Sequence, residues 1–187
     1  MVFWARGPSE QRPVPPDVAP PKPPPWPVEK GDVRVLSRDE PQNLKASIRV
    51  REIDVSAVLF LGASHPPRLR FVTEIGPTSA FPAFECEARG PFVDDTDTFS
   101  VDHGDANRRF IFRGDRVAFQ RLCGVEALLA VDSSCPEILR LTWDGRSKMS
   151  AAYSLTSFAD TEAKDAALLH FVGLAERVPR ETYRGRS

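Results

Sequence analysis

The residues of this chain that are best suited to metal or acid–base chemistry surround one histidine. His103 is flanked by Asp102 and Asp105 and is preceded by three more aspartates, Asp94, Asp95 and Asp97. An imidazole beside carboxylates can bind a divalent metal ion or act as a general base. The spacing matches neither the calcium loop D-x-D-x-D-G nor the zinc motif H-E-x-x-H. His103, Asp102 and Asp105 are therefore kept as metal-site candidates, while no catalytic residue, cofactor or metal is assigned.

The three cysteines show no redox or zinc pattern. Cys86, Cys123 and Cys135 are widely spaced, without a C-x-x-C pair. A cysteine nucleophile needs a nearby base and an electropositive setting. Cys123 lies on an apolar helical face and Cys86 alternates with glutamates, so both are predicted to be structural. Whether Cys123 and Cys135 form a disulfide stays open.

Arginines recur on or beside the predicted strands and form a second group with chemical potential. On a shared open sheet face they would make a cationic patch for an acidic partner or for RNA. Single-stranded RNA also requires aromatic side chains on that face, but the phenylalanines alternate to the opposite side. We favour a solvated face, with an acidic partner second and no nucleic acid; the arginines are Arg49, Arg51, Arg68, Arg70, Arg108, Arg109 and Arg113.

Prolines are concentrated at the N-terminal end. Each proline ring fixes φ and removes a backbone donor, so the tract favours extended polyproline II conformation. Residues 1–30 are therefore predicted to be a disordered, proline-rich leader. It either acts as a spacer or docks into an aromatic-lined groove of a protein partner through Pro23, Pro24, Pro25 and Trp26.

Composition narrows the class of protein further. The 187 residues carry a formal net charge of −1, which gives no electrostatic case for a nucleic-acid partner. The longest apolar run, 57–62, is too short to cross a membrane, and the first residues lack the features of a secretory signal. We expect a soluble, cytoplasmic protein, of bacterial type by its Ala/Arg/Pro/Asp-rich composition.

Residues 33–88 carry the pattern of a sheet. Short apolar runs or period-2 alternation predict strands near 33–36, 46–50, 69–75 and 84–88. The apolar run Val58–Leu61 is predicted to lie in the middle of the sheet or under a helix.

A hairpin is predicted over 99–112. Pairing Val101 with Phe110 and Phe99 with Phe112 places the apolar residues on one face and leaves a four-residue loop, 104–107. Asp115 is a natural N-cap for a helix to about residue 123, and a second short helix is predicted to Val131.

A second hairpin is predicted over 139–155. Asp144-Gly145 favours a two-residue turn, but that turn would split the apolar face formed by Leu141, Trp143 and their partners. We therefore predict a loop of three or five residues with Gly145 at positive φ.

The last element is the clearest helix. Asp160 or Thr161 caps it, and Pro179 stops it. Its predicted buried stripe is Ala167, Leu168, Phe171, Val172, Leu174, Ala175 and Val178.

Together these elements predict an α+β fold, mostly antiparallel sheet with helices packed on one face. The C-terminal half should follow the order hairpin–helix–hairpin–helix. A single domain is expected over 31–179, followed by a frayed tail, 180–187.

The function expected from the sequence is a non-enzymatic interaction or accessory domain. It would bind an unidentified protein partner through its sheet or its proline-rich leader. Two alternatives stay open: a small metal-dependent or hydrolytic enzyme centred on His103, and a small-ligand carrier with an apolar cavity between the strand at Val58 and the last helix. The oligomeric state is left open.

Overall fold

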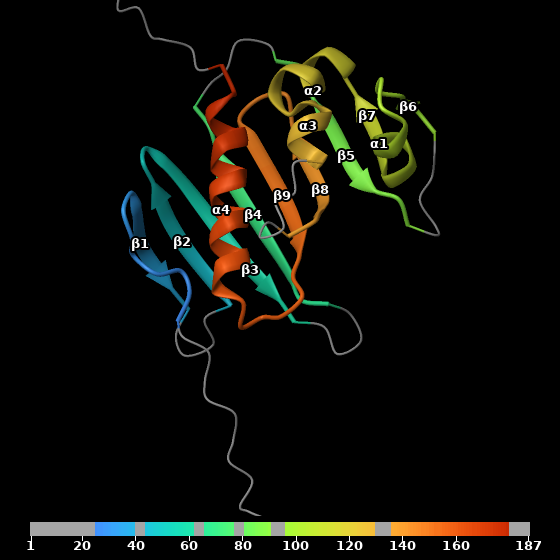
Figure 1. The fold of residues 1–187 in the computed structure, drawn as a ribbon. Helices are drawn as coiled ribbons and strands as arrows, with labels where there is room; N and C mark the ends of the chain where they lie inside the picture. The colour runs from blue at the N-terminus through green and yellow to red at the C-terminus, as the bar shows by residue number, and fades with distance from the viewer. Residues whose placement is uncertain are drawn as a thin grey trace, which may run out of the picture.

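The computed structural model describes residues 25–39, 44–61, 66–76, 81–90, 96–129 and 136–179. In these ranges, nine antiparallel strands form one sheet in the order β1-β2-β3-β4-β9-β8-β5-β7-β6. The helices α2 (Arg116–Leu122), α3 (Gly124–Leu129) and α4 (Thr161–Glu176) lie against one face of it (Figure 1). The predicted α+β class with a mostly antiparallel sheet is confirmed. The strands are β1 (Val33–Arg38), β2 (Lys45–Val50), β3 (Ile53–Phe60), β4 (Arg68–Glu74), β5 (Phe84–Ala88), β6 (Thr98–Phe99), β7 (Phe110–Gly114), β8 (Ile138–Trp143) and β9 (Lys148–Ser154).

Alternation along the strands separates a buried face from a wet one. In β2, Ala46, Ile48 and Val50 are buried while the residues between them are not, as the period-2 pattern predicts. The apolar run at the end of β3 behaves differently from its prediction. Phe60 is 50% exposed because it pairs with Arg68 on the face of the sheet away from the helices, and Leu61, which follows the end of the strand, is 54% exposed.

Two aromatic clusters fill the space between sheet and helices. Under α4 (Thr161–Glu176), the Phe71 ring packs against Phe171 at 5.5 Å and Tyr153 at 5.8 Å between centroids. Under α2 (Arg116–Leu122), Phe119 contacts Phe84 and Phe112. The predicted stripe of the last helix is buried throughout.

The hairpin predicted over 99–112 is only partly present. Phe99 pairs with Phe112 as predicted, but the expected loop is a helix, α1 (Gly104–Arg109). The Val101–Phe110 pairing is therefore wrong. Instead the Asn107 side chain accepts from the Val101 N–H at 2.9 Å and donates to its carbonyl at 2.7 Å, which satisfies the groups that a partner strand would have bound. The simple hairpin–helix–hairpin–helix order is not confirmed, because α1 separates β6 from β7.

The second hairpin follows the parity argument. Trp143 pairs with Met149, and the Asp144 N–H donates to the Lys148 carbonyl, so residues 145–147 form a three-residue loop. Gly145 has φ +80. Alternation from Leu141 and Trp143 would also put Leu139 in the core, but a bulge after Ile138 buries Ile138 in its place.

The helix starts also match their predictions. Asp115 caps α2 by accepting from the Ala118 N–H at 2.7 Å, and Asp160 caps α4 by accepting from the Ala163 N–H at 2.9 Å. A short α3 (Gly124–Leu129) follows α2, with Gly124 at φ +68. No helix in the described part of the chain is both long and apolar enough to span a membrane.

Trp26, predicted to belong to the leader and to bind a partner, is instead part of the core. It is 6% exposed, its ring lies 6.2 Å from that of Phe71, and its Nε1 donates to Asp165 on α4 at 2.8 Å. The Lys164 ammonium lies over the same ring at 5.7 Å. The packed fold therefore begins before residue 31. Pro23 and Pro24 lie outside the described residues, as do 1–22 and 180–187, so the leader and tail predictions are not tested there.

Replacing Trp26 by alanine should lower the free energy of unfolding by about 3–5 kcal/mol, since it empties a buried aromatic site. Urea unfolding followed by circular dichroism measures this change. Leu169→Ala is the control, because Leu169 lies on the solvent-facing side of α4 and is 56% exposed. Its effect on the free energy of unfolding should stay within about 0.5 kcal/mol. Equal transitions for the two variants would show that Trp26 does not stabilise the core.

Candidate functional site

The sheet face opposite the helices, which we call the open face, is rich in basic side chains. The helices α2, α3 and α4 all lie on the other side of the sheet (Figure 1). Cross-strand register places eight cationic residues and four acidic ones there, although the whole chain has a net charge of −1. The cations are Arg34, Lys45, Arg49, Arg68, Arg70, Arg113, Arg140 and Lys148, and the acids are Asp54, Glu74, Glu85 and Glu87.

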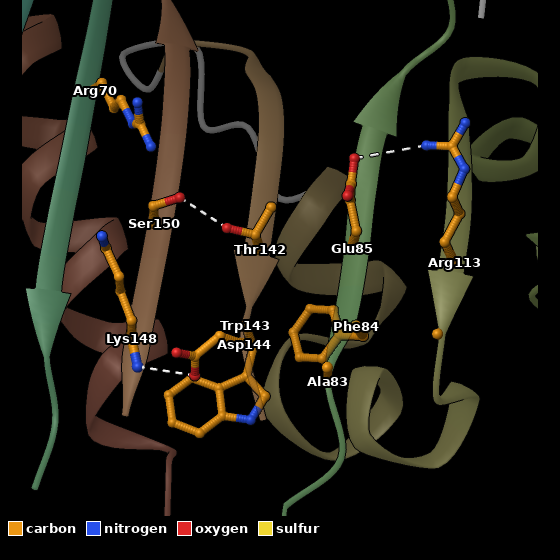
Figure 2. Close-up of a pocket in the computed structure, with 11 residues that line it drawn as sticks. Arg70, Ala83, Phe84, Glu85, Arg113, Thr142, Trp143, Asp144, Lys148 and Ser150 are labelled. Carbon is orange, nitrogen blue, oxygen red and sulfur yellow. Dashed lines mark hydrogen bonds and ion pairs between the residues drawn. The ribbon is translucent and has the colours of Figure 1, made fainter. Parts of the chain in front are cut away.

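A hollow of about 430 Å³ lies in the middle of the open face, and we call it the central hollow. Strands β4, β9, β8, β5 and β7 supply its floor and walls (Figure 2). Its lining residues are Arg70, Ala83, Phe84, Glu85, Arg113, Gly114, Thr142, Trp143, Asp144, Lys148 and Ser150.

Two cations of the central hollow are not neutralised by a neighbour. Neither Arg70 nor Lys148 forms an ion pair through its side chain with any residue in the described ranges. Beside them the hydroxyls of Thr142 and Ser150 lie 2.7 Å apart and share one hydrogen bond. The hollow thus presents uncompensated positive charge next to hydroxyl groups, which suits an anion.

The acids of the central hollow are engaged by the protein itself. Glu85 contacts Arg140 at 2.9 Å and Arg113 at 3.5 Å. Asp144 accepts from the backbone N–H groups of Arg146, Ser147 and Lys148 at 2.8, 2.9 and 3.0 Å. Partial burial opposes ionisation of Asp144, but these hydrogen bonds outweigh it and lower the pKa of the carboxyl. Both carboxylates are held in place and are poor competitors for the free cations.

The candidates around His103 do not converge on a metal site. His103 is exposed and caps α1, its Nδ1 accepting from the Ala106 N–H at 3.3 Å. Asp105 pairs with Arg108 on the same helix, and Asp102 is exposed. Asp94 and Asp95 lie outside the described residues. Within the described ranges, no group of three or more His, Cys, Asp or Glu side chains is placed to hold a metal ion.

The two described cysteines are buried free thiols. Burial raises the pKa of Cys86 strongly and that of Cys123 to about 12, so neither forms a thiolate at neutral pH. Cys135 lies outside the described residues, but Cys123 is a free thiol and is therefore not part of a disulfide.

The sequence predicted a cavity between the strand at Val58 and the last helix, but Val58 does not face that helix. Val58 pairs with Lys45 and Arg70 and therefore points to the open face, away from α4. The space under α4 near this strand is occupied by Phe71 and Phe171.

Sequence reasoning found Arg70 and Arg113 but missed Lys148, Ser150 and Thr142 as site residues. The signal was present in the alternation itself. Lys148 and Ser150 flank the buried Met149, and Thr142 lies between the buried Leu141 and Trp143, so all three must face the same side. What was missing was the strand order that brings β4, β9 and β8 together.

No protein-family model, curated protein or solved structure matches this chain. Function must therefore be inferred from the geometry of the open face.

Asp144→Ala should lower the free energy of unfolding by about 1 kcal/mol at neutral pH, as the loss of a capping carboxylate does. Because the folded pKa is lowered, the carboxylate stabilises the fold above the ordinary aspartate pKa of 3.8, and this contribution is lost as the pH falls through the folded value. The gap between wild type and variant should thus shrink in acid. Urea titrations at neutral pH and below pH 3.8 measure it, with the exposed Asp102→Ala as control; a gap that widened in acid would contradict the assignment.

Proposed function

We propose that this protein is a non-enzymatic interaction domain that binds an acidic segment of a protein partner across the open face of its sheet. The observation that carries this proposal is the excess of cations on that face, eight against four acids, on a chain whose net charge is −1. Complementary potential steers association and selects partners of opposite charge.

A protein partner is favoured over RNA by the position of the aromatic side chains. Single-stranded RNA is held by bases stacked on aromatic rings beside the cations. Among the described strand residues, the register puts a single aromatic side chain, Phe60, on the open face, while Phe71, Tyr153 and Trp143 face the core. Charge without stacking surfaces fits a flexible acidic polypeptide.

The open face is also favoured over the sheet edges. At the edge strand β1, a bulge follows Val35, and the Val35 N–H is already taken by the Glu29 carboxylate at 3.2 Å. At the other edge, β6 has two residues. Short or bulged edges resist pairing with an added strand, so a partner would gain more from the face.

The proline-rich leader is a second part of the proposal. Its prolines favour docking into a partner's aromatic-lined groove, and Pro25 is exposed at the border of the packed fold. We also propose a cytoplasmic location, with which the free thiols Cys86 and Cys123 are compatible.

Binding of a fluorescein-labelled acidic peptide of alternating glutamate and glycine, measured by fluorescence anisotropy, tests the open face. The double variant Arg68→Glu/Arg70→Glu should weaken binding about tenfold or more, because it replaces attraction by repulsion. Binding by the wild type should also weaken as ionic strength rises.

The matched control is Arg116→Glu/Arg121→Glu, which makes the same charge change at exposed positions of α2 on the helix side. It should retain most of the affinity. Equal losses in both double variants, or tighter binding to single-stranded RNA than to the peptide, would overturn the proposal.

Removal of residues 1–24 tests the leader's share. The truncation must stop there, because Trp26 belongs to the core. We expect unchanged affinity for the acidic peptide and weaker binding to a peptide-binding domain with an aromatic-lined groove, such as an SH3 domain, measured by the same assay with labelled protein. Unchanged binding to the SH3 domain would remove the leader from the proposal.

A further inference from the structure

We infer that the central hollow is a subsite for a phosphorylated side chain, a phosphoserine or phosphothreonine, within the acidic segment that the open face binds. This inference rests on the proposed function and adds the chemistry that the middle of the face would recognise. It depends on three features of the hollow: two free cations, a hydroxyl pair, and acids that are already engaged.

The two free cations surround one position of the sheet. Ser150 on β9 pairs with Val72 on β4; Arg70 lies two residues before Val72, and Lys148 two residues before Ser150. Arg70 and Lys148 therefore project on the same face as Ser150. Arg70 is its diagonal neighbour on β4 and Lys148 its neighbour on β9, each at a spacing of about 7–8 Å from Ser150. The Lys148 side chain extends toward Arg70 (Figure 2). Two uncompensated positive charges match a phosphomonoester, which carries about −1.5 to −2 at neutral pH.

The hydroxyl pair supplies a third donor. Thr142 Oγ1 and Ser150 Oγ lie 2.7 Å apart, and one hydroxyl proton makes that hydrogen bond. The second proton is left to donate to a ligand. The guanidinium and ammonium donors come from β4 and β9, and the hydroxyl pair spans β8 and β9. Three acceptor oxygens in a tetrahedral arrangement use such donors better than the two coplanar oxygens of a carboxylate.

The acids near the hollow would repel an anion only weakly. Glu85 is neutralised by Arg140 and Arg113, and Asp144 is held by backbone N–H groups. Among the described residues, the acid best positioned to compete is Glu74, the direct cross-strand partner of Lys148. Its removal should therefore strengthen anion binding, an effect opposite in sign to removal of the cations.

Three labelled peptides test the inference by fluorescence anisotropy with the full chain. They share one acidic sequence of glutamate and glycine and differ at one central position, which holds serine, glutamate or phosphoserine. The phosphoserine peptide should bind about tenfold more tightly than the serine peptide and clearly more tightly than the glutamate peptide.

Variants locate the preference. Arg70→Gln/Lys148→Gln should abolish the tenfold preference, Ser150→Ala should reduce it, and Glu74→Gln should raise affinity for the phosphopeptide. The control Arg34→Gln/Lys45→Gln removes two cations of the same face on β1 and β2. It should weaken all three peptides alike and keep the preference. Circular dichroism checks that each variant folds.

The outcomes separate this inference from the proposed function. If the serine and glutamate peptides bind but phosphorylation adds nothing, the inference is wrong and the proposed function stands. If no acidic peptide binds, both are wrong. Tight binding of inorganic phosphate alone, or of vesicles containing phosphatidic acid in place of the phosphopeptide, would also overturn the assignment to a phosphorylated side chain.

Discussion

One constraint governs this structure: a single broad sheet buries one face against the helices and leaves most of the other face in water. Phe71, packed between Trp26, Tyr153 and Phe171, lies at the centre of the buried side. A shift of one residue in any strand would move its apolar set into solvent. Burial of one face therefore sets the register of every strand, and with it the polar residues that meet on the other face.

The central hollow is a consequence of that register combined with close backbone approach. Two glycines at positive φ, Gly114 at the end of β7 and Gly145 in the loop after β8, bring the backbone close to Ala83, the residue before β5. A Cβ on Gly114 would lie 2.4 Å from the Ala83 carbonyl oxygen, and one on Gly145 would lie 2.9 Å from its nitrogen. Only glycine permits this approach, which shapes the end of the hollow near Ala83 and Asp144 (Figure 2).

Some cations of the open face are paired with acidic side chains, and others are not. Arg49 is paired with Asp54, and Arg113 and Arg140 are engaged by glutamates. Exposed pairs of this kind contribute little to stability, but they determine which charges stay available. Within the part of the chain that the structure describes, the pairing leaves Arg70 and Lys148 as the unneutralised cations of the hollow. This asymmetry gives the face a preferred position for an anion.

Local sequence determined the features that depend on neighbours along the chain. The period of β2, the aspartate caps of α2 and α4, and the odd loop between Trp143 and Met149 follow from alternation, side-chain capping and parity. Tertiary structure alone decided the strand order, the burial of Trp26, the exposure of Phe60 and the helix α1. Each of these depends on what packs from far away in the chain: Trp26 is covered by α4, and Asn107 satisfies Val101 in place of a strand. The site follows the same division, because the residue types and their faces could be predicted, whereas the meeting of β4, β9 and β8 could not.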